Sequence, residues 1–322
     1  MTATDQEARW FAESFERVAQ NVALGVRGKD HVVRLAVCCL LTGGHLLLED
    51  NPGTGKTQLA KALANSIRGS HSRIQFTPDL LPTDITGVSV YDQASGRFTF
   101  RRGPVFATIV LADEINRASP KTQSALLEVM EEGRVTVDGE SHQVPSPFMV
   151  IATQNPIEQA GTYRLPEAQL DRFLMKASIG YPDHDVTVAL LAEAQLRDRS
   201  AGIAPVISDQ AVTQMVTLAG ATHVDPTILS YVARLAEESR RHPHVALGIS
   251  VRGGLSFVRA AKTWAMSVGR EYVVPDDVKL LAQPVLSHRL VLTDEAQFAG
   301  VRVESVIDDL MTHVEPPAYR AA

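Results

Sequence analysis

Cysteine is scarce in this sequence of 322 residues, which contains only Cys38 and Cys39. The two are adjacent within an apolar run, and neighbouring cysteines rarely bridge each other because their side chains point in different directions. A framework of disulfides is therefore excluded, which favours a reducing compartment.

An excess of basic residues is also lacking, and so are segments that would direct the chain to a membrane. The 31 Lys and Arg residues face 37 Asp and Glu residues, and the net charge of −6 disfavours a dedicated nucleic-acid binder. The first residues show neither the basic nor the apolar region of a signal peptide. The longest apolar stretch, 35–48, is interrupted at 42–45 and is too short to cross a bilayer. We therefore expect a soluble, cytoplasmic protein with no direct membrane insertion.

The overall composition is that of a folded protein with about two domains. Apolar residues make up 45% of the chain and charged residues 21%, which are ordinary globular values. Up to residue 181, short apolar strands alternate with helices, and this alternation predicts an α/β layer with a parallel sheet. Beyond 181–184 the signals are almost entirely helical. We predict an α/β core over 1–181 and an all-α domain over 182–322.

Apolar periodicity and turn residues indicate the individual elements. In the first domain, strands are expected at 45–49, 73–77, 108–112, 148–153 and 175–180, and helices at 6–24, 29–41, 57–67 and 119–132. In the second, helices are expected at 185–197, 208–219, 226–242, 252–268, 276–288 and 303–313, with a short strand at 289–293. Two hairpins interrupt the first domain near 88–101 and 134–144, the second around the turn-forming pair Asp138-Gly139.

A phosphate-binding loop is indicated at 50–57, where Asp-Asn-Pro-Gly-Thr-Gly-Lys-Thr follows a strand and opens a helix. Backbone N–H groups of such a loop converge on phosphate oxygens, and the helix dipole adds to the attraction. Lys56 would reach the β- and γ-phosphates, and the Thr57 hydroxyl would bind Mg²⁺. The predicted nucleotide-binding residues of this loop are Asn51, Pro52, Gly53, Thr54, Gly55, Lys56, Thr57 and Gln58.

Two features limit this interpretation. The first glycine of the usual phosphate-loop pattern is Asp50 here, at a position that begins the turn. A glycine turn that caps a helix by chance is the bland alternative. A dinucleotide fingerprint fails, because Gln58 stands where its third glycine would be.

Two acids, Asp113 and Glu114, end the buried strand expected at 108–112. Strand ends in parallel sheets face the ligand crevice. Asp113 would hold Mg²⁺ through water, and Glu114 would accept a proton from the water that attacks the γ-phosphate. The alternative is an exposed pair of acids at a strand end.

The phosphate loop, the acid pair and the run 113–128 together resemble the MoxR family of AAA+ ATPases, in the helix-2-insert clade. Further segments are similar to family motifs: 151–156 to sensor 1, 161–173 to the arginine-finger segment, 250–255 to sensor 2, 26–30 to the adenine-side loop and 288–292 to the C-terminal stretch. The resemblance implies a five-stranded sheet ordered 5-1-4-3-2, a helical lid and ring oligomers, most often hexamers. It also implies that the two hairpins are the helix-2 insert and the pre-sensor-1 hairpin, which face the central pore.

The resemblance assigns roles to residues outside the loop and the acid pair. Asn155 would orient the attacking water, Arg172 would reach a neighbouring subunit's γ-phosphate, and Arg252 would bridge the lid and the γ-phosphate. Val26 and Gly28 would line the adenine pocket. The corresponding alternatives are a polar turn residue, a surface ion pair with Asp171, a solvated arginine and an ordinary interhelical turn.

Arg117 and Arg164 are further basic residues that the resemblance places near the subunit interface, without separate roles.

The function implied is that of a ring-forming, Mg²⁺-dependent ATPase that remodels or matures a protein partner, with ATP and Mg²⁺ as cofactors. A von Willebrand factor A domain protein is one candidate partner. A nucleic-acid motor on the same ATPase and a nucleotide-binding switch with negligible turnover remain alternatives. The arginines and phenylalanines of 97–102 could grip nucleic acid by charge and stacking, but Asp138 and Glu140 would repel phosphate, so no nucleic-acid partner is expected.

Overall fold

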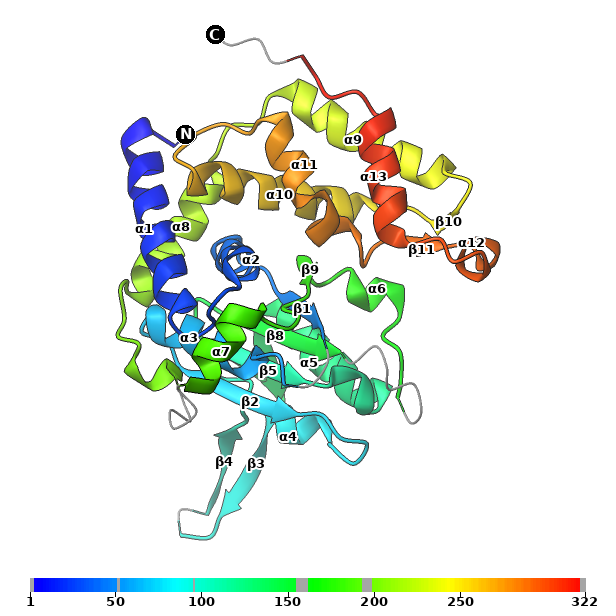
Figure 1. Ribbon diagram of the computed structural model, residues 1–322. Coiled ribbons are helices and arrows are strands. Elements are labelled where there is room, and N and C mark those ends of the chain that lie inside the picture. The colour runs from blue at the N-terminus through cyan, green and yellow to red at the C-terminus, as the bar shows by residue number, and fades with distance from the viewer. Residues whose placement is uncertain (1–2, 51–52, 95, 155–161, 193–198, 319–322) are drawn as a thin grey trace.

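The computed structural model describes residues 3–50, 53–94, 96–154, 162–192 and 199–318. A parallel sheet forms the lower part of the molecule in Figure 1, and a helical domain lies above it. None of the helices within these ranges is long and apolar enough to cross a membrane.

The central sheet has five strands, all parallel. They are β1 (Leu46–Glu49), β2 (His71–Gln75), β5 (Ile109–Asp113), β8 (Met149–Gln154) and β9 (Met175–Ala177). Their order is β2-β5-β8-β1-β9. If these five strands are numbered 1 to 5 in chain order and the sheet is read from β9, the order is 5-1-4-3-2. The predicted strand order is therefore confirmed.

Alternate residues of the strands pack into two separate apolar layers, because successive side chains point to opposite faces of a sheet. Leu46, Leu48 and Leu111 belong to the layer under α1 (Asp5–Ala23), α2 (Asp30–Leu41) and α3 (Lys56–Ser66). Leu47 and Val110 face α5 (Pro120–Glu132) on the other side. Coverage on both faces explains why β5 is buried throughout.

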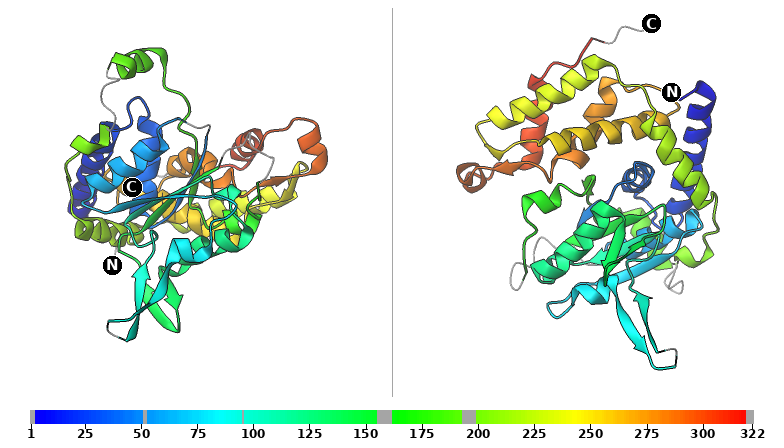
Figure 2. Two further views of the ribbon diagram at one scale, coloured as in Figure 1. Left: turned by 90° about the horizontal axis from the view of Figure 1, so that it is seen from below. Right: turned by 180° about the vertical axis from the view of Figure 1, so that it is seen from behind.

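Two antiparallel hairpins extend from this core, as predicted. One pairs β3 (Gly87–Asp92) with β4 (Arg97–Arg102), and the other pairs β6 (Arg134–Val137) with β7 (Glu140–Gln143). Figures 1 and 2 show β3 and β4 projecting away from the helical domain. The rings of Phe100 and His142 stack at 4.1 Å, so the two hairpins contact each other.

Helices dominate the chain from His184 onward. They are α7 (His184–Ala192), α8 (Asp209–Gly220), α9 (Pro226–Arg241), α10 (Val251–Ser267), α11 (Pro275–Leu286), α12 (Asp294–Phe298) and α13 (Val303–His313). Helix α10 is the centre of this domain and packs on α8, α9 and α11 as well as on α1 and α2. The side chain of Ser250 caps its amino terminus.

Short elements account for most differences from the predicted boundaries. The expected strand 289–293 contains only β11 (Val291–Leu292), which pairs with β10 (Val245–Leu247). The helices α4 (Pro82–Thr86), α6 (Glu167–Leu170) and α12 were not predicted. Strand β9 ends at Ala177 rather than at 180, because the backbone amides of Ile179 and Gly180 donate to the Asp50 side chain instead of to a strand.

Candidate nucleotide site

The phosphate loop connects β1 to α3 and has an open inner face. Gly53 and Gly55 have φ values of +85° and +95°, in the left-handed region that favours glycine. A Cβ added to either would meet no atom of the described residues within 4 Å. The residue that precedes α3 is Gly55, which has no side chain to cap the helix that begins at Lys56. The helix terminus and the loop therefore offer backbone amides to an anion.

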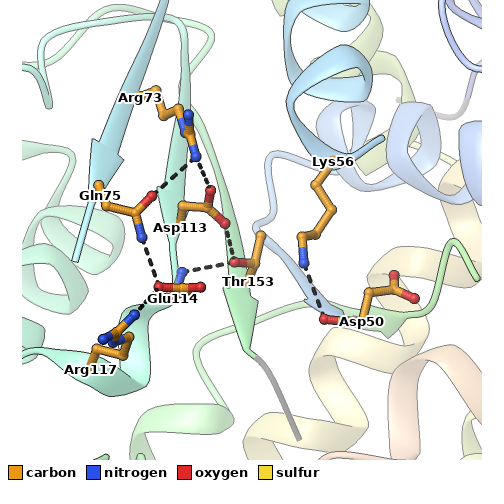
Figure 3. Close-up of polar contacts among 8 residues, drawn as sticks. All are labelled: Asp50, Lys56, Arg73, Gln75, Asp113, Glu114, Arg117 and Thr153. Atoms are coloured by element: carbon orange, nitrogen blue, oxygen red, sulfur yellow. Dashed lines mark hydrogen bonds and ion pairs between the residues drawn. The ribbon is translucent and has the colours of Figure 1, made fainter. Parts of the chain in front are cut away.

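Asp50, where the usual pattern has glycine, anchors the loop to the chain after β9. Its carboxylate is buried and accepts hydrogen bonds from the Ser178 hydroxyl at 2.8 Å and from the amides of Ile179 and Gly180 at 2.6 and 2.9 Å. Its backbone oxygen accepts a bond from Lys56 Nζ at 3.1 Å (Figure 3). The departure from the pattern thus has a structural role. Asn51 and Pro52 lie outside the described residues.

Asp113 ends β5 with a buried carboxylate whose two oxygens have different partners. One accepts a bond from the Thr153 hydroxyl at 2.6 Å, and the other pairs with Arg73 at 2.6 Å (Figure 3). Thr153 also accepts a bond from the Glu114 amide at 2.8 Å. A buried carboxylate is costly unless it is paired and hydrogen-bonded, and β2 and β8 supply these partners from either side of β5.

Glu114 follows directly and turns its carboxylate away from Asp113. Its backbone has φ 57° and ψ 50°, an uncommon conformation for a residue other than glycine. Its carboxylate accepts bonds from Gln75 at 2.8 Å and from Arg117 at 3.0 Å (Figure 3). Arg117, predicted only as a basic residue near an interface, therefore contacts the second acid of the pair.

Arg73, Gln75 and Thr153 were not among the predicted site residues. Gln75 lies opposite Asp113 in the register of β2 and β5, and Thr153 lies on β8. Polar residues at strand ends next to an acidic strand end are a usable signal, but it needs the strand order, which the residues alone do not provide.

The donor set fits a magnesium ion. Asp113 presents a carboxylate at a strand end, and Thr57 lies in the first turn of α3. Carboxylate and hydroxyl oxygens are the hard ligands that Mg²⁺ takes, usually with several waters retained. Arg73, whose side chain is about half exposed, neutralises Asp113 here.

Arg172 and Arg252 lie together, at the opposite edge of the sheet from Lys56. Both pair with Glu131, at 3.0 and 2.8 Å. They line a cavity of about 410 Å³ that also includes His45, just before β1. Lys56 follows the other end of β1, and a strand of four residues spans about 13 Å. The structure therefore brings the two arginines to each other and does not bring Arg252 to its own phosphate loop.

The remaining predicted residues are less closely tied to the site. Val26 is buried, and Gly28 lies so close to α7 that an added Cβ would be 2.9 Å from Val186. Arg164 is exposed. Asn155 lies outside the described residues.

Comparison with known proteins identifies relatives over almost the whole chain. Residues 45–175 match the ATPase family associated with various cellular activities (AAA), and residues 237–310 match the AAA lid domain. The uncharacterized protein YeaC of Bacillus subtilis is 46% identical over 92% of each chain. Chaperone MoxR1 of Mycobacterium tuberculosis is 40% identical over 96% of this chain and 84% of its own.

A solved structure agrees with the arrangement of both domains. A crystal structure from Cytophaga hutchinsonii, described as that of a candidate ATPase, is 33% identical and superposes with a TM-score of 0.90. The match covers 97% of this chain and 98% of the other.

Proposed function

Because this chain belongs to the MoxR family of AAA+ ATPases, we propose that it binds ATP with Mg²⁺ at the phosphate loop and hydrolyses the terminal phosphate. One observation carries the proposal. The open glycine loop after β1 and the acid pair at the end of β5 lie at the same edge of the sheet, and only β8 separates the two strands. Ligands of open α/β sheets bind at this edge.

Different residues of the chain are proposed to bind the phosphates, the magnesium ion and the attacking water. The loop amides and Lys56 would hold the phosphates, and Asp113 and Thr57 would hold the magnesium ion, which would supply positive charge to neutralise the phosphate oxygens. Glu114 accepts a proton from the attacking water at its carboxylate. Gln75 and Arg117 both donate to Oε2 of Glu114 in this structure, so the proton would be accepted at Oε1. Asn155 is proposed to orient the same water.

Turnover is proposed to require a neighbouring subunit. Arg172 and Arg252 share Glu131 in a cavity remote from their own phosphate loop. In a ring, most simply a hexamer, this cavity would face the nucleotide of the next subunit. An arginine supplied from a neighbour raises phosphoryl-transfer rates by about 10³–10⁵-fold. The two arginines would then make hydrolysis depend on assembly.

The biological role we propose is chaperone-like remodelling of a protein partner in the cytoplasm. Chaperone MoxR1 is one of the relatives, and a von Willebrand factor A domain protein is a candidate client. The β3–β4 hairpin exposes Tyr91 and Phe98, whose ring centroids are 5.3 Å apart. Exposed aromatic side chains on a projecting hairpin are suited to contact an unfolded or partly folded chain.

A nucleic-acid motor is the second candidate, because Arg97, Arg101 and Arg102 are exposed on β4. The exposed acids Asp138 and Glu140 on the neighbouring hairpin oppose it. DNA that raises the turnover rate, with a steep dependence on salt, would favour the motor over the chaperone.

The proposal is tested by nucleotide affinity and phosphate release in matched variants. Lys56→Ala should lose affinity for ATP, and Glu114→Gln should bind ATP and hydrolyse it poorly. Lys121→Ala and Glu128→Gln change the same charges on the exposed face of α5 and should behave as the unmodified protein. An unchanged rate in Glu114→Gln would favour a nucleotide-binding switch. Partners retained on ATP-bound Glu114→Gln can be identified by mass spectrometry.

A further inference from the structure

The C-terminal stretch 288–292 contains a buried arginine that binds the segment carrying Arg172. The side chain of Arg289 is 2% exposed. Its Nε donates to the Asp171 carboxylate at 2.7 Å, and its Nη atoms donate to the backbone oxygens of Phe173 at 2.7 Å and Leu174 at 3.1 Å. A further bond reaches the Val285 oxygen within the lid. One guanidinium therefore links the lid to the residues on both sides of Arg172.

Neighbouring residues of the lid reinforce the same contact. His288 Nε2 lies 3.0 Å from the Phe173 oxygen, which Arg289 also contacts. The Ser250 hydroxyl, which caps α10, donates to the second carboxylate oxygen of Asp171 at 2.8 Å. Asp171 therefore binds two parts of the lid, Ser250 at the start of α10 and Arg289 shortly after the end of α11.

The chemistry of this cluster requires an arginine. Burial lowers the pKa of the Arg289 guanidinium, and its bond to Asp171 opposes that effect. The planar guanidinium carries five donors in fixed directions and can serve several acceptors at once, which the ammonium of a lysine cannot do with the same geometry. Asp171 and Arg289 each make several hydrogen bonds in this buried network, which favours a single arrangement of the two side chains.

We propose that Arg289 is a positioning residue, which fixes the 171–174 segment against the lid so that Arg172 is aimed at the neighbouring subunit's nucleotide. This inference rests on the proposed role of Arg172 in trans. The contacts support positioning because they lie on the residue before Arg172 and on the two residues after it. Arg252, in the first turn of α10, is brought to Glu131 by the same packing. Movement of the lid would therefore move both arginines.

Asp171→Asn tests the proposal, because it removes the charge that Arg289 binds and keeps the side-chain shape. We expect ATP affinity within about twofold of the unmodified protein and a loss of turnover of about 10- to 100-fold at saturating ATP, as for other small misplacements of a catalytic group. Arg289→Lys should show the same loss. Adding Glu114→Gln subunits, which supply an intact 171–174 segment, should restore hydrolysis at the intact phosphate sites of the variant.

Asp277→Asn is the matched control. Asp277 is also a buried acid paired with an arginine, Arg270, at 2.6 Å, but the pair lies within the lid, at the start of α11. The Asp277→Asn substitution should lower the unfolding temperature but leave the turnover rate per folded molecule unchanged.

Three results would overturn the proposal. If Arg172→Ala loses turnover while Asp171→Asn and Arg289→Lys keep it, Arg289 does not position Arg172, and the proposed function stands. If Asp171→Asn loses ATP affinity and cannot be rescued by mixing, its contacts serve only folding. If Arg172→Ala itself keeps full turnover, both the positioning and the trans role are wrong.

Discussion

At the scale of single residues, the site places two adjacent carboxylates in different surroundings. Asp113 is buried and bound by Thr153 and Arg73, whereas Glu114 is bound by Gln75 and Arg117. Separate partners allow adjacent acids to serve separate roles, one toward a metal ion and one toward a water. Thr153 contributes to both, since it donates to Asp113 and accepts from the Glu114 amide.

Replacement of Thr153 by valine tests this shared contact. The side chain is fully buried, so Thr153→Val leaves the Glu114 amide and one Asp113 oxygen without this partner. We expect the free energy of unfolding to fall by about 1–3 kcal/mol, measured by urea denaturation. Thr153→Ser keeps the hydroxyl and should lose less. Thr153→Ser lacks the γ-methyl group that valine keeps, so a loss in Thr153→Ser as large as that in Thr153→Val would show that packing of the methyl group contributes as much as the hydrogen bonds.

His45 predicts an acid-sensitive stability. Burial lowers the pKa of His45 to about 4, and its ring bridges the Met130 oxygen and the Val150 amide as a neutral imidazole. The unfolded chain binds the proton more tightly, so stability is full above about pH 6.5 and falls as the pH decreases toward 4. The loss is about 3 kcal/mol at most. The urea concentration at the midpoint of unfolding, measured from pH 7.5 to 5, should fall less in His45→Gln than in the unmodified protein. An identical fall in both proteins would show that His45 does not cause the acid sensitivity.

The site residues that could be predicted without the family resemblance belong to short, continuous sequence motifs. Lys56 and Thr57 follow a glycine turn, and Asp113 and Glu114 end an apolar run. Arg73 and Gln75 could not be recognised, because their role depends on β2 lying beside β5. Which strands are neighbours in a sheet depends on the tertiary fold, and the residues of β2 alone do not indicate that β5 lies beside it.

At the scale of elements, long periodic segments were predicted well and short ones were not. Helices α1, α2 and α10 lie within a residue of their predicted bounds because an apolar stripe repeats over several turns. Helix α4 and helix α12 have five residues each, too few to establish a period. Strand β9 was predicted too long, since tertiary bonds to Asp50 end it early.

Helix α2 buries both cysteines beneath the lid, and this predicts unreactive thiols. Burial raises the pKa of Cys38 to about 12 and raises the pKa of Cys39 well above its usual value. Since the thiolate is the reactive form, a disulfide reagent such as Ellman's should titrate neither thiol in the native protein and both in guanidinium chloride. Ser124→Cys, on the exposed face of α5, provides a thiol that should react at once. Rapid native reaction of the two natural cysteines would show that α2 opens.

At the scale of the whole molecule, the lid sets where the arginines act. Arg172 and Arg252 are far apart in the sequence, and Glu131 joins them in the cavity before β1. The family resemblance implied a bridge from Arg252 to the γ-phosphate. The sequence could not orient the lid, because that orientation depends on contacts such as the one between Arg289 and Asp171.

Mixed assemblies distinguish action within a subunit from action on its neighbour. Arg252→Ala and Arg172→Ala should each bind ATP, hydrolyse it slowly and recover when mixed with Glu114→Gln subunits, which carry both arginines. Recovery should grow with the fraction of Glu114→Gln up to an optimum, measured as phosphate released per mutant subunit. If only Arg172→Ala recovers, Arg252 acts on its own subunit's nucleotide, which requires a lid position different from the one seen here.

The central claim is that ATP is cleaved between the Lys56 loop and the acid pair. The most direct measurement is phosphate release from ATP and Mg²⁺ as a function of protein concentration, for the unmodified chain, Lys56→Ala and Glu114→Gln. We expect a specific activity that rises with concentration in the unmodified protein and is near background in both variants, with ATP affinity kept only in Glu114→Gln. No phosphate release by the unmodified protein at any concentration, or equal release by all three, would contradict the claim.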